Sequence, residues 1–225
     1  MHKNHLFYFN FALSLFFIAF IGFGVNGIVN PNKLPPKNLL THTHALFMFC
    51  WLAFIPLQIY LSQLKKPTIR NLQKTSLGIA VGMVITIFLM TASKYQRVPN
   101  VLIDVTFNLL SIVNFMVLIG IFIRKELSSY NSYRLLLLAS LIIILPGLKR
   151  LLRIFSFEEN IAFILLLFLF IIFAINEIKN EKKIHKFTIL SAYLIVQSVI
   201  LSLLLIRFEL WENTIDQLMN YIEIV

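Results

Sequence analysis

The chain has 225 residues, of which 59% are hydrophobic and only 13% are charged. Soluble domains carry roughly 45–50% apolar and about 25% charged residues, so this composition excludes an ordinary soluble domain and indicates an integral membrane protein. The net charge of +10 does not indicate a nucleic-acid partner, because the basic residues lie mainly between long apolar runs, where they orient a membrane protein.

Seven apolar runs follow one another along the chain, and each predicts a helix, since about 20 mainly apolar residues span a bilayer. The first run is too long for the apolar core of a typical secretory signal, which has about 7–15 residues, and we expect it to remain as an anchor. The fifth run is short enough to form a re-entrant segment instead of a span. We expect residues 1–225 to form a single transmembrane domain with helices at about 6–29, 40–62, 75–94, 101–123, 135–154, 160–178 and 187–208.

The segments after the second, fourth and sixth runs are rich in lysine and arginine, which predicts their side of the membrane. If all three are cytoplasmic, an even number of crossings separates each neighbouring pair, and runs five and six must both cross. The prediction is an all-α bundle of seven transmembrane helices, with a cytoplasmic N-terminus and the C-terminus outside. The basic residues concerned are Lys65, Lys66, Arg70 and Lys74, then Arg124, Lys125 and Arg134, then Lys179, Lys182, Lys183 and Lys186.

The motif GFGVNG at 22–27 matches the dinucleotide-binding fingerprint in its glycine spacing. That fingerprint requires a preceding strand and a following helix N-terminus, so that backbone N–H groups meet the pyrophosphate. Here an apolar helix precedes the motif. We therefore expect these glycines to serve close packing and helix termination rather than nucleotide binding.

The stretch THTHALFMFCW at 41–51 holds two histidines and the only cysteine of the chain. His42 and His44 are two residues apart and point to nearly opposite faces of a helix, while Cys50 lies about two turns further on. The predicted topology also separates these histidines from His185 by the membrane, which disfavours a bis-histidine haem. We expect no bound cofactor and no metal ion.

Depth in the membrane brings together a more plausible set of polar residues. His44 lies about one turn into the second helix and Asp104 about one turn into the fourth, both counted from the outside. Lys149, Arg150 and Arg153 follow Pro146 at the outer end of the fifth. An acid, an imidazole and several cations at one level can bind a small anion or a polar headgroup, or relay protons. The alternative is a salt-bridged rim of snorkelling side chains.

The second helix also places Trp51 and Gln58 on the face of His44, at heptad spacing. Trp51 lies away from the interfacial belts where tryptophan is enriched, so we expect it inside the bundle. Asn108 follows Asp104 by one turn on the fourth helix, where asparagine can equally hydrogen-bond a neighbouring helix. The predicted ligand-binding residues are His44, Trp51, Gln58, Asp104, Asn108 and Arg150.

Three stretches resemble an uncharacterised family of bacterial multipass membrane proteins. The family has a His-Ala start followed by Trp and Gln in its second helix, a basic start and a Pro-x-x-x-Arg end in its fifth, and an acidic, then basic, then Val-His linker before its last. Here these are HALFMFCWLAFIPLQ (44–58), SYRLLLLASLIIILPGLKR (132–150) and NEIKNEKKIHKFT (176–188). The matching residues are His44, Trp51, Gln58, Arg134, Pro146, Arg150, Glu177 and His185.

The resemblance covers about residues 40–190 and implies the same topology in a bacterial inner membrane. The chain departs from the family pattern at two histidines, one before the third helix and one that corresponds to Ser132. If those histidines bind a cofactor in the relatives, this chain has lost that capacity. The resemblance implies no biochemical activity.

Three functions fit these patterns. The first is binding, sensing or transport of a small polar or anionic ligand near the outer surface. The second is a membrane redox or metal-dependent enzyme that uses His44, although neither G-x-S-x-G nor H-E-x-x-H occurs in the sequence. The third is a structural subunit that contacts a partner protein. The lipid bilayer is the expected partner, and the sequence leaves a homo-oligomer or a partner subunit open.

Overall fold

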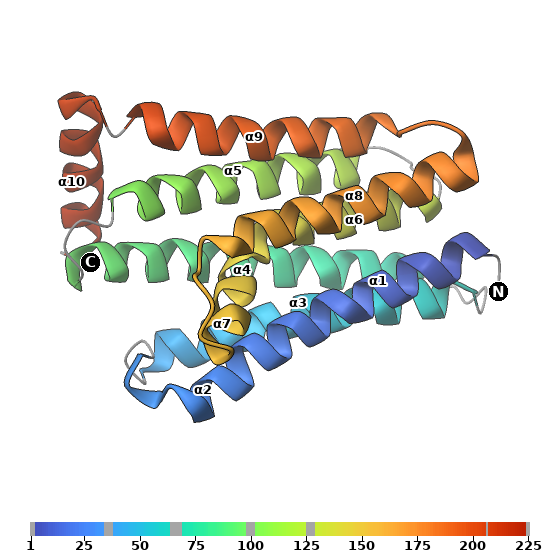
Figure 1. The fold of residues 1–225 in the computed structure, drawn as a ribbon, viewed down its shortest axis with the longest axis horizontal. Helices are drawn as coiled ribbons and strands as arrows, with labels where there is room; N and C mark the ends of the chain where they lie inside the picture. Colours follow the sequence, from blue (N-terminus) through green and yellow to red (C-terminus); the bar gives the residue numbers. More distant parts are fainter. Residues whose placement is uncertain are drawn as a thin grey trace.

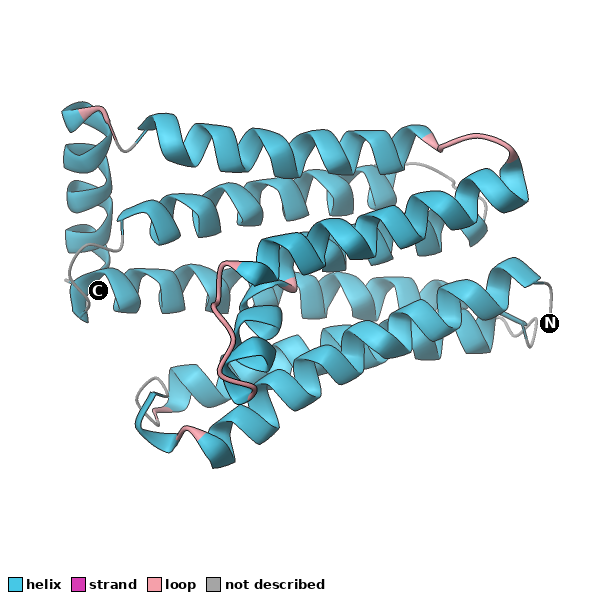
Figure 2. Ribbon diagram, in the orientation of Figure 1, coloured by secondary structure: helices cyan, strands magenta, loops and turns pink. Residues whose placement is uncertain are grey.

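The computed structural model describes residues 3–33, 38–63, 69–97, 102–124, 129–205 and 207–223. Every regular element within these ranges is helical, which confirms the expected all-α class (Figure 2). The helices are α1 (Lys3–Phe20), continued by a π-helical turn (Ile21–Val25) and α2 (Asn26–Val29), then a 3₁₀ turn (Pro31–Lys33), α3 (Leu39–Gln63), α4 (Ile69–Arg97), α5 (Leu102–Arg124), α6 (Ser129–Ile143), α7 (Leu145–Ile154), α8 (Ile161–Glu181), α9 (Lys186–Leu205) and α10 (Glu209–Glu223).

The long helices run side by side along one axis, whereas α10 crosses their ends (Figure 1). We call the end with the N-terminus and the α8–α9 connection the N-terminal end of the bundle. The end with α10 is the C-terminal end. Within the described residues, six helices are long and apolar enough to cross a membrane, or seven if α6 and α7 together form one span. Length and composition are therefore those of a multipass membrane protein.

Helix α6 lies in the centre of the bundle. Every side chain from 132 to 145 is buried, and the helix packs against α1, α3, α5, α8 and α9. A helix that is apolar on all sides is expected to be surrounded by protein or lipid, and here protein surrounds it. The short fifth apolar run is therefore the core of the bundle.

The chain bends where a single helix was expected over 135–154. Helix α6 ends at Ile143, α7 begins at Leu145, and their axes differ by 55°. Pro146 has no N–H to donate to the carbonyl one turn earlier, and its ring clashes with that carbonyl. The amide N–H of Gly147 instead donates to the Ile144 carbonyl at 2.8 Å. The proline thus explains the break, and the pair is either a broken span or a re-entrant segment.

Helix α7 crosses the π-helical turn that follows α1 at a point of close backbone contact. A Cβ atom added to Gly22 would lie 2.4 Å from the carbonyl oxygen of Gly147. Only a residue without a side chain fits at this crossing. The first glycine of GFGVNG is therefore a packing residue, as the sequence predicted.

Candidate functional site

Asp104 lies in the first turn of α5 and joins three helices at the C-terminal end of the bundle. Its Oδ2 accepts a hydrogen bond from Nζ of Lys94 on α4 at 2.6 Å, and its Oδ1 lies 3.7 Å from Nζ of Lys149 on α7. A carboxylate is also favoured at a helix N-terminus by the helix dipole. The depth argument therefore placed Asp104 at the level of α7 correctly, but its contact there is Lys149 and not Arg150.

Arg150 has no carboxylate partner within the described residues. Its Nη1 donates to the Pro146 carbonyl at 3.2 Å, and its guanidinium lies over the Phe23 ring, 4.3 Å from the ring centroid. The side chain is half-buried. The next cation on α7, Arg153, is paired through Nε with Glu159 at 2.9 Å. Of the three cations on α7, Arg150 is the one that forms no ion pair with a described carboxylate.

His44 lies at the same end of the bundle, on α3. Its Nδ1 is 3.2 Å from Oγ1 of Thr86 on α4. The Thr86 hydroxyl already donates its single proton to the Met83 carbonyl at 3.0 Å, so Nδ1 of His44 is the donor to Thr86. This leaves Nε2 of His44 as the acceptor in the neutral ring. Arg150 lies close enough to His44 for its charge to act on the imidazole.

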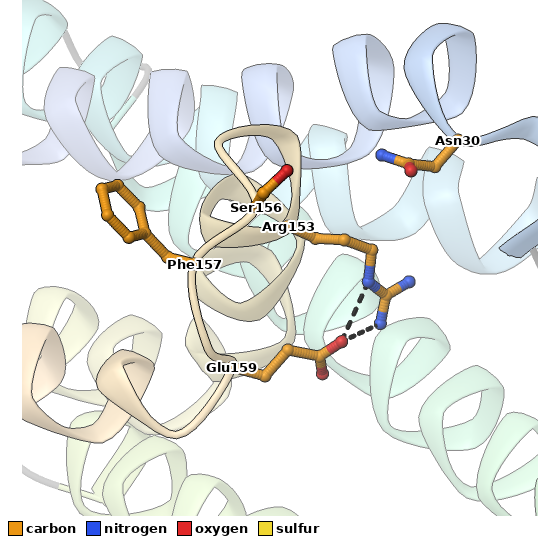
Figure 3. A pocket seen from close by; sticks show the side chains of 5 residues that line it. All are labelled: Asn30, Arg153, Ser156, Phe157 and Glu159. Atoms are coloured by element: carbon orange, nitrogen blue, oxygen red, sulfur yellow. Dashed lines mark hydrogen bonds and ion pairs between the residues drawn. The ribbon is translucent and has the colours of Figure 1, made fainter.

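An open cavity of about 620 Å³ lies beside α7 and is lined by residues that the sequence analysis mostly did not select (Figure 3). Arg153 and Glu159 face each other across one side of it, as their dashed contacts show. Ser156 follows α7 with a left-handed backbone, φ 61°, and closes the helix by donating its N–H to the Arg153 carbonyl. The lining residues are Asn30, Arg153, Ser156, Phe157 and Glu159.

A further unused donor lies next to this cavity. Asn30 donates from Nδ2 to Oδ1 of Asn26 at 3.1 Å. Asn26 is fully buried, and its own Nδ2 has no hydrogen-bond partner in the described part of the chain. Helix α2, which carries Asn26, packs against α7. The contact between α2 and α7 therefore brings a buried donor without an acceptor near the helix of Arg150.

Trp51 and Gln58 lie deeper in the bundle than His44. The Trp51 ring is 1% exposed, and its Nε1 donates to Oγ of Ser140 on α6 at 3.0 Å, which confirms its expected place inside the bundle. Gln58 is also buried, and its Oε1 has no partner among the described residues. It lies two heptads beyond His44, about 21 Å along the helix axis. A single small ligand therefore cannot touch both His44 and Gln58.

The asparagines of α5 have different surroundings. Asn108 is half-buried, and no hydrogen bond of its side chain is seen within the described ranges. Asn114, two turns further on, donates to Oγ of Ser198 on α9 at 2.6 Å and to the Leu194 carbonyl at 2.9 Å. Asn114 therefore joins α5 to α9 by hydrogen bonds.

The N-terminal end of the bundle holds a buried charge cluster that the predicted site did not include. Arg134, on α6, is 2% exposed, and its Nε lies 2.5 Å from Oε1 of the buried Glu177 on α8. This contact is an ion pair rather than an aligned hydrogen bond, since Nε has no hydrogen-bond partner within the described residues. The guanidinium also bonds Glu181 and, at 3.1 Å, the Tyr8 hydroxyl of α1.

Glu177 is in turn fixed by the start of α9. Its Oε1 accepts a hydrogen bond from Oγ1 of Thr188 at 2.8 Å, and its Oε2 accepts one from the backbone N–H of His185 at 2.9 Å. Burial lowers the pKa of His185 below its ordinary value, and the positive charge of Arg134 acts in the same direction. The cluster therefore ties α1, α6, α8 and α9 together.

Sequence reasoning assigned Arg134 to a basic linker, although the resemblance did select Arg134, Glu177 and His185. The predicted topology contained a signal that could have identified the pairing of Arg134 with Glu177. Runs five and six are consecutive, so the first residues of one and the last residues of the next lie at the same membrane surface. An arginine and a glutamate at those two positions are expected to pair.

No family model matches this sequence, and neither a curated protein nor a solved structure matches it at a significant level. Within the described residues, no group of three or more His, Cys, Asp or Glu side chains is placed to hold a metal ion.

Proposed function

We propose that this chain is a multipass membrane protein that binds a small oxyanion at the C-terminal end of the bundle, with Arg150 as its main contact. The observation that carries the proposal is the half-buried guanidinium of Arg150, which forms no ion pair within the described residues. Its neighbours Lys149 and Arg153 have carboxylate contacts in Asp104 and Glu159, whereas Arg150 has none, so a bound anion would give Arg150 an ion pair.

The chemistry of Arg150 favours an oxyanion over other ligands. A buried charge without a partner is costly, and an ionisable residue inside the membrane region is a functional candidate by default. The guanidinium is a planar fork that matches phosphate and carboxylate oxygens. The buried amide of Asn26 provides a further donor on the neighbouring helix. The same chemistry fits a free phosphate and the phosphate of a lipid headgroup.

We further propose seven spans with the N-terminus in the cytoplasm and the C-terminus outside, in a bacterial inner membrane. The support is the bias of lysine and arginine toward the linkers after the second, fourth and sixth apolar runs, together with the family resemblance. In this orientation the oxyanion site is at the outer membrane surface.

The oxyanion site can be tested by thermal unfolding of the detergent-purified protein. Inorganic phosphate is titrated against chloride at matched ionic strength, and phosphatidic acid is added to the micelles in a separate series. A ligand at 100 times its Kd adds about 2.7 kcal/mol, which for a chain of this size raises the midpoint by roughly 5–10 °C. We expect Arg150→Gln to lose this shift and Arg150→Lys to retain part of it.

Arg207→Gln is the matched control, because it removes an exposed arginine at the same end of the bundle. It should leave the shift unchanged. Stabilisation by phosphate would identify a free anion as ligand, and stabilisation by phosphatidic acid alone would identify a headgroup. If neither probe stabilises the unsubstituted protein, or if Arg150→Gln keeps the full shift, the proposed site is wrong.

A further inference from the structure

Helix α10 is fixed at the level where two long helices end. It lies across the C-terminal end of the bundle, at a steep angle to the long helices (Figure 1). Ile215 and Met219 pack against Ala92 of α4 and Val105 of α5. Nε1 of Trp211 donates to Oγ1 of Thr106 on α5 at 2.9 Å. These contacts hold α10 at the last turns of α4 and the first turn of α5.

The same contacts fix the rotation of α10 about its own axis. The Tyr95 hydroxyl at the end of α4 donates to the Asp216 carboxylate, on the edge of the packed face. Asp216, Ile215 and Trp211 therefore contact protein from one side of the helix. The directions in which the other faces of α10 point are therefore fixed as well.

The apolar sector of α10 is only partly covered by this packing. With 3.6 residues per turn, Leu210, Leu218 and Tyr221 form a strip beside the packed face. These side chains are 79%, 40% and 72% exposed, respectively. The side of α10 opposite the strip carries Glu209 and Glu212, which are also exposed. The helix therefore has a packed face, an uncovered apolar strip and a polar face.

We propose that the bilayer covers this strip, so that α10 is an interfacial helix with Leu210, Leu218 and Tyr221 at the boundary of headgroups and acyl chains. Candidate spans end at Tyr95 and begin at Leu102, which places α10 at the depth of that boundary. A helix that lies in the membrane plane with an apolar strip toward the acyl chains is the known form of such anchors. Tyr95, Trp211 and Tyr221 fit the aromatic belt at this depth.

The charged residues of α10 indicate which interaction holds the helix at the membrane surface. Interfacial helices that depend on anionic lipids carry lysine and arginine on the polar face. Here that face carries Glu209 and Glu212 and no basic residue, since α10 contains no lysine or arginine. The strip is therefore held by apolar burial and by the tethers to α4 and α5. Its contact with the bilayer is independent of lipid charge and of salt.

Spin labelling tests this arrangement in the whole protein. Replacing the single cysteine, Cys50→Ser, gives a background for Leu210→Cys and Leu218→Cys on the strip and for Glu212→Cys on the polar face. Each variant carries one nitroxide and is placed in phosphatidylcholine nanodiscs. We expect the strip labels to collide severalfold more with oxygen than with a water-soluble nickel chelate. The label at residue 212 should show the reverse.

The ratio at the strip should stay the same in nanodiscs that contain phosphatidylglycerol and at raised salt. The proposal fails if the strip labels are as accessible to nickel as the label on the polar face, because the strip then faces water. It also fails if the strip labels are shielded from both reagents, because a second copy of the chain then covers them.

Discussion

Arg134 is the only charged residue in the sequence of α6, the helix at the centre of the bundle. Moving a guanidinium and a carboxylate out of water costs several kcal/mol for each ion, and their attraction offsets this only when further hydrogen bonds complete the shell. Arg134 has such a shell in Glu177, Glu181, Tyr8 and Asn131. The pair therefore fixes where α6 sits against α8 more than it adds net stability.

At this scale we predict a large effect of Glu177→Gln, because the variant removes the fully buried carboxylate that pairs with a buried guanidinium. Breaking such a pair costs about 3–5 kcal/mol of unfolding free energy. This corresponds to a fall of roughly 10 °C in the unfolding midpoint for a chain of this size, measured in detergent. Glu158→Gln makes the same chemical change at an exposed residue and should shift the midpoint by less than about 2 °C.

A double variant separates a lost pair from general damage at this position. Replacing both partners, Arg134→Met with Glu177→Met, removes both charges and should recover most of the lost stability. If the double variant is as unstable as Glu177→Gln, the loss comes from the contacts of Glu177 to Thr188 and His185 instead. A normal midpoint for Glu177→Gln itself would contradict the buried pair.

At the scale of elements, the break between α6 and α7 decides which side chains reach the candidate site. The 55° bend after Ile143 directs α7 across the π-helical turn, and this brings Arg150 over Phe23. A straight helix would have continued along the bundle axis. The crossing depends on the backbone contact between Gly22 and Gly147.

We therefore predict that Gly22→Ala destabilises the protein. The added Cβ would lie 2.4 Å from the Gly147 carbonyl oxygen, and backbone atoms on both sides must move. Overpacking of this kind costs about 1–3 kcal/mol. Gly24→Ala, two residues away in the same turn, meets nothing within 4 Å and should be neutral or slightly stabilising, because alanine is the better helix former. Unfolding midpoints of the two variants, measured side by side, decide the matter; equal midpoints would contradict the tight crossing.

At the scale of the whole molecule, the apolar runs and their spacing were sufficient to predict an all-helical chain with several helices long enough to span a membrane. The depth of His44 and Asp104 also followed from counting turns. Counting turns did not predict which neighbouring side chain each residue contacts, because successive residues of a helix point about 100° apart. Lys149 and Arg150 have the same depth but different directions, and only packing shows which one faces Asp104.

The proposed orientation makes a last prediction, which also decides whether α6 and α7 cross the membrane together. In the Cys50→Ser background, cysteines are placed by Lys74→Cys at the start of the third apolar run, by Asn160→Cys before α8 and by Lys183→Cys after α8. All three positions are exposed. With seven spans, a membrane-impermeant maleimide added to spheroplasts labels only the cysteine at 160.

The other two cysteines should then react only after the membrane is permeabilised. If α6 and α7 form a re-entrant segment, an odd number of crossings separates residues 74 and 183, because only the third, fourth and sixth runs then cross between them. The cysteines at these positions would in that case be labelled from opposite sides. Labelling of the cysteines at residues 74 and 183 from outside would instead mean that the whole topology is inverted. Because Arg150 follows the bend, the same result fixes the side from which an oxyanion reaches it.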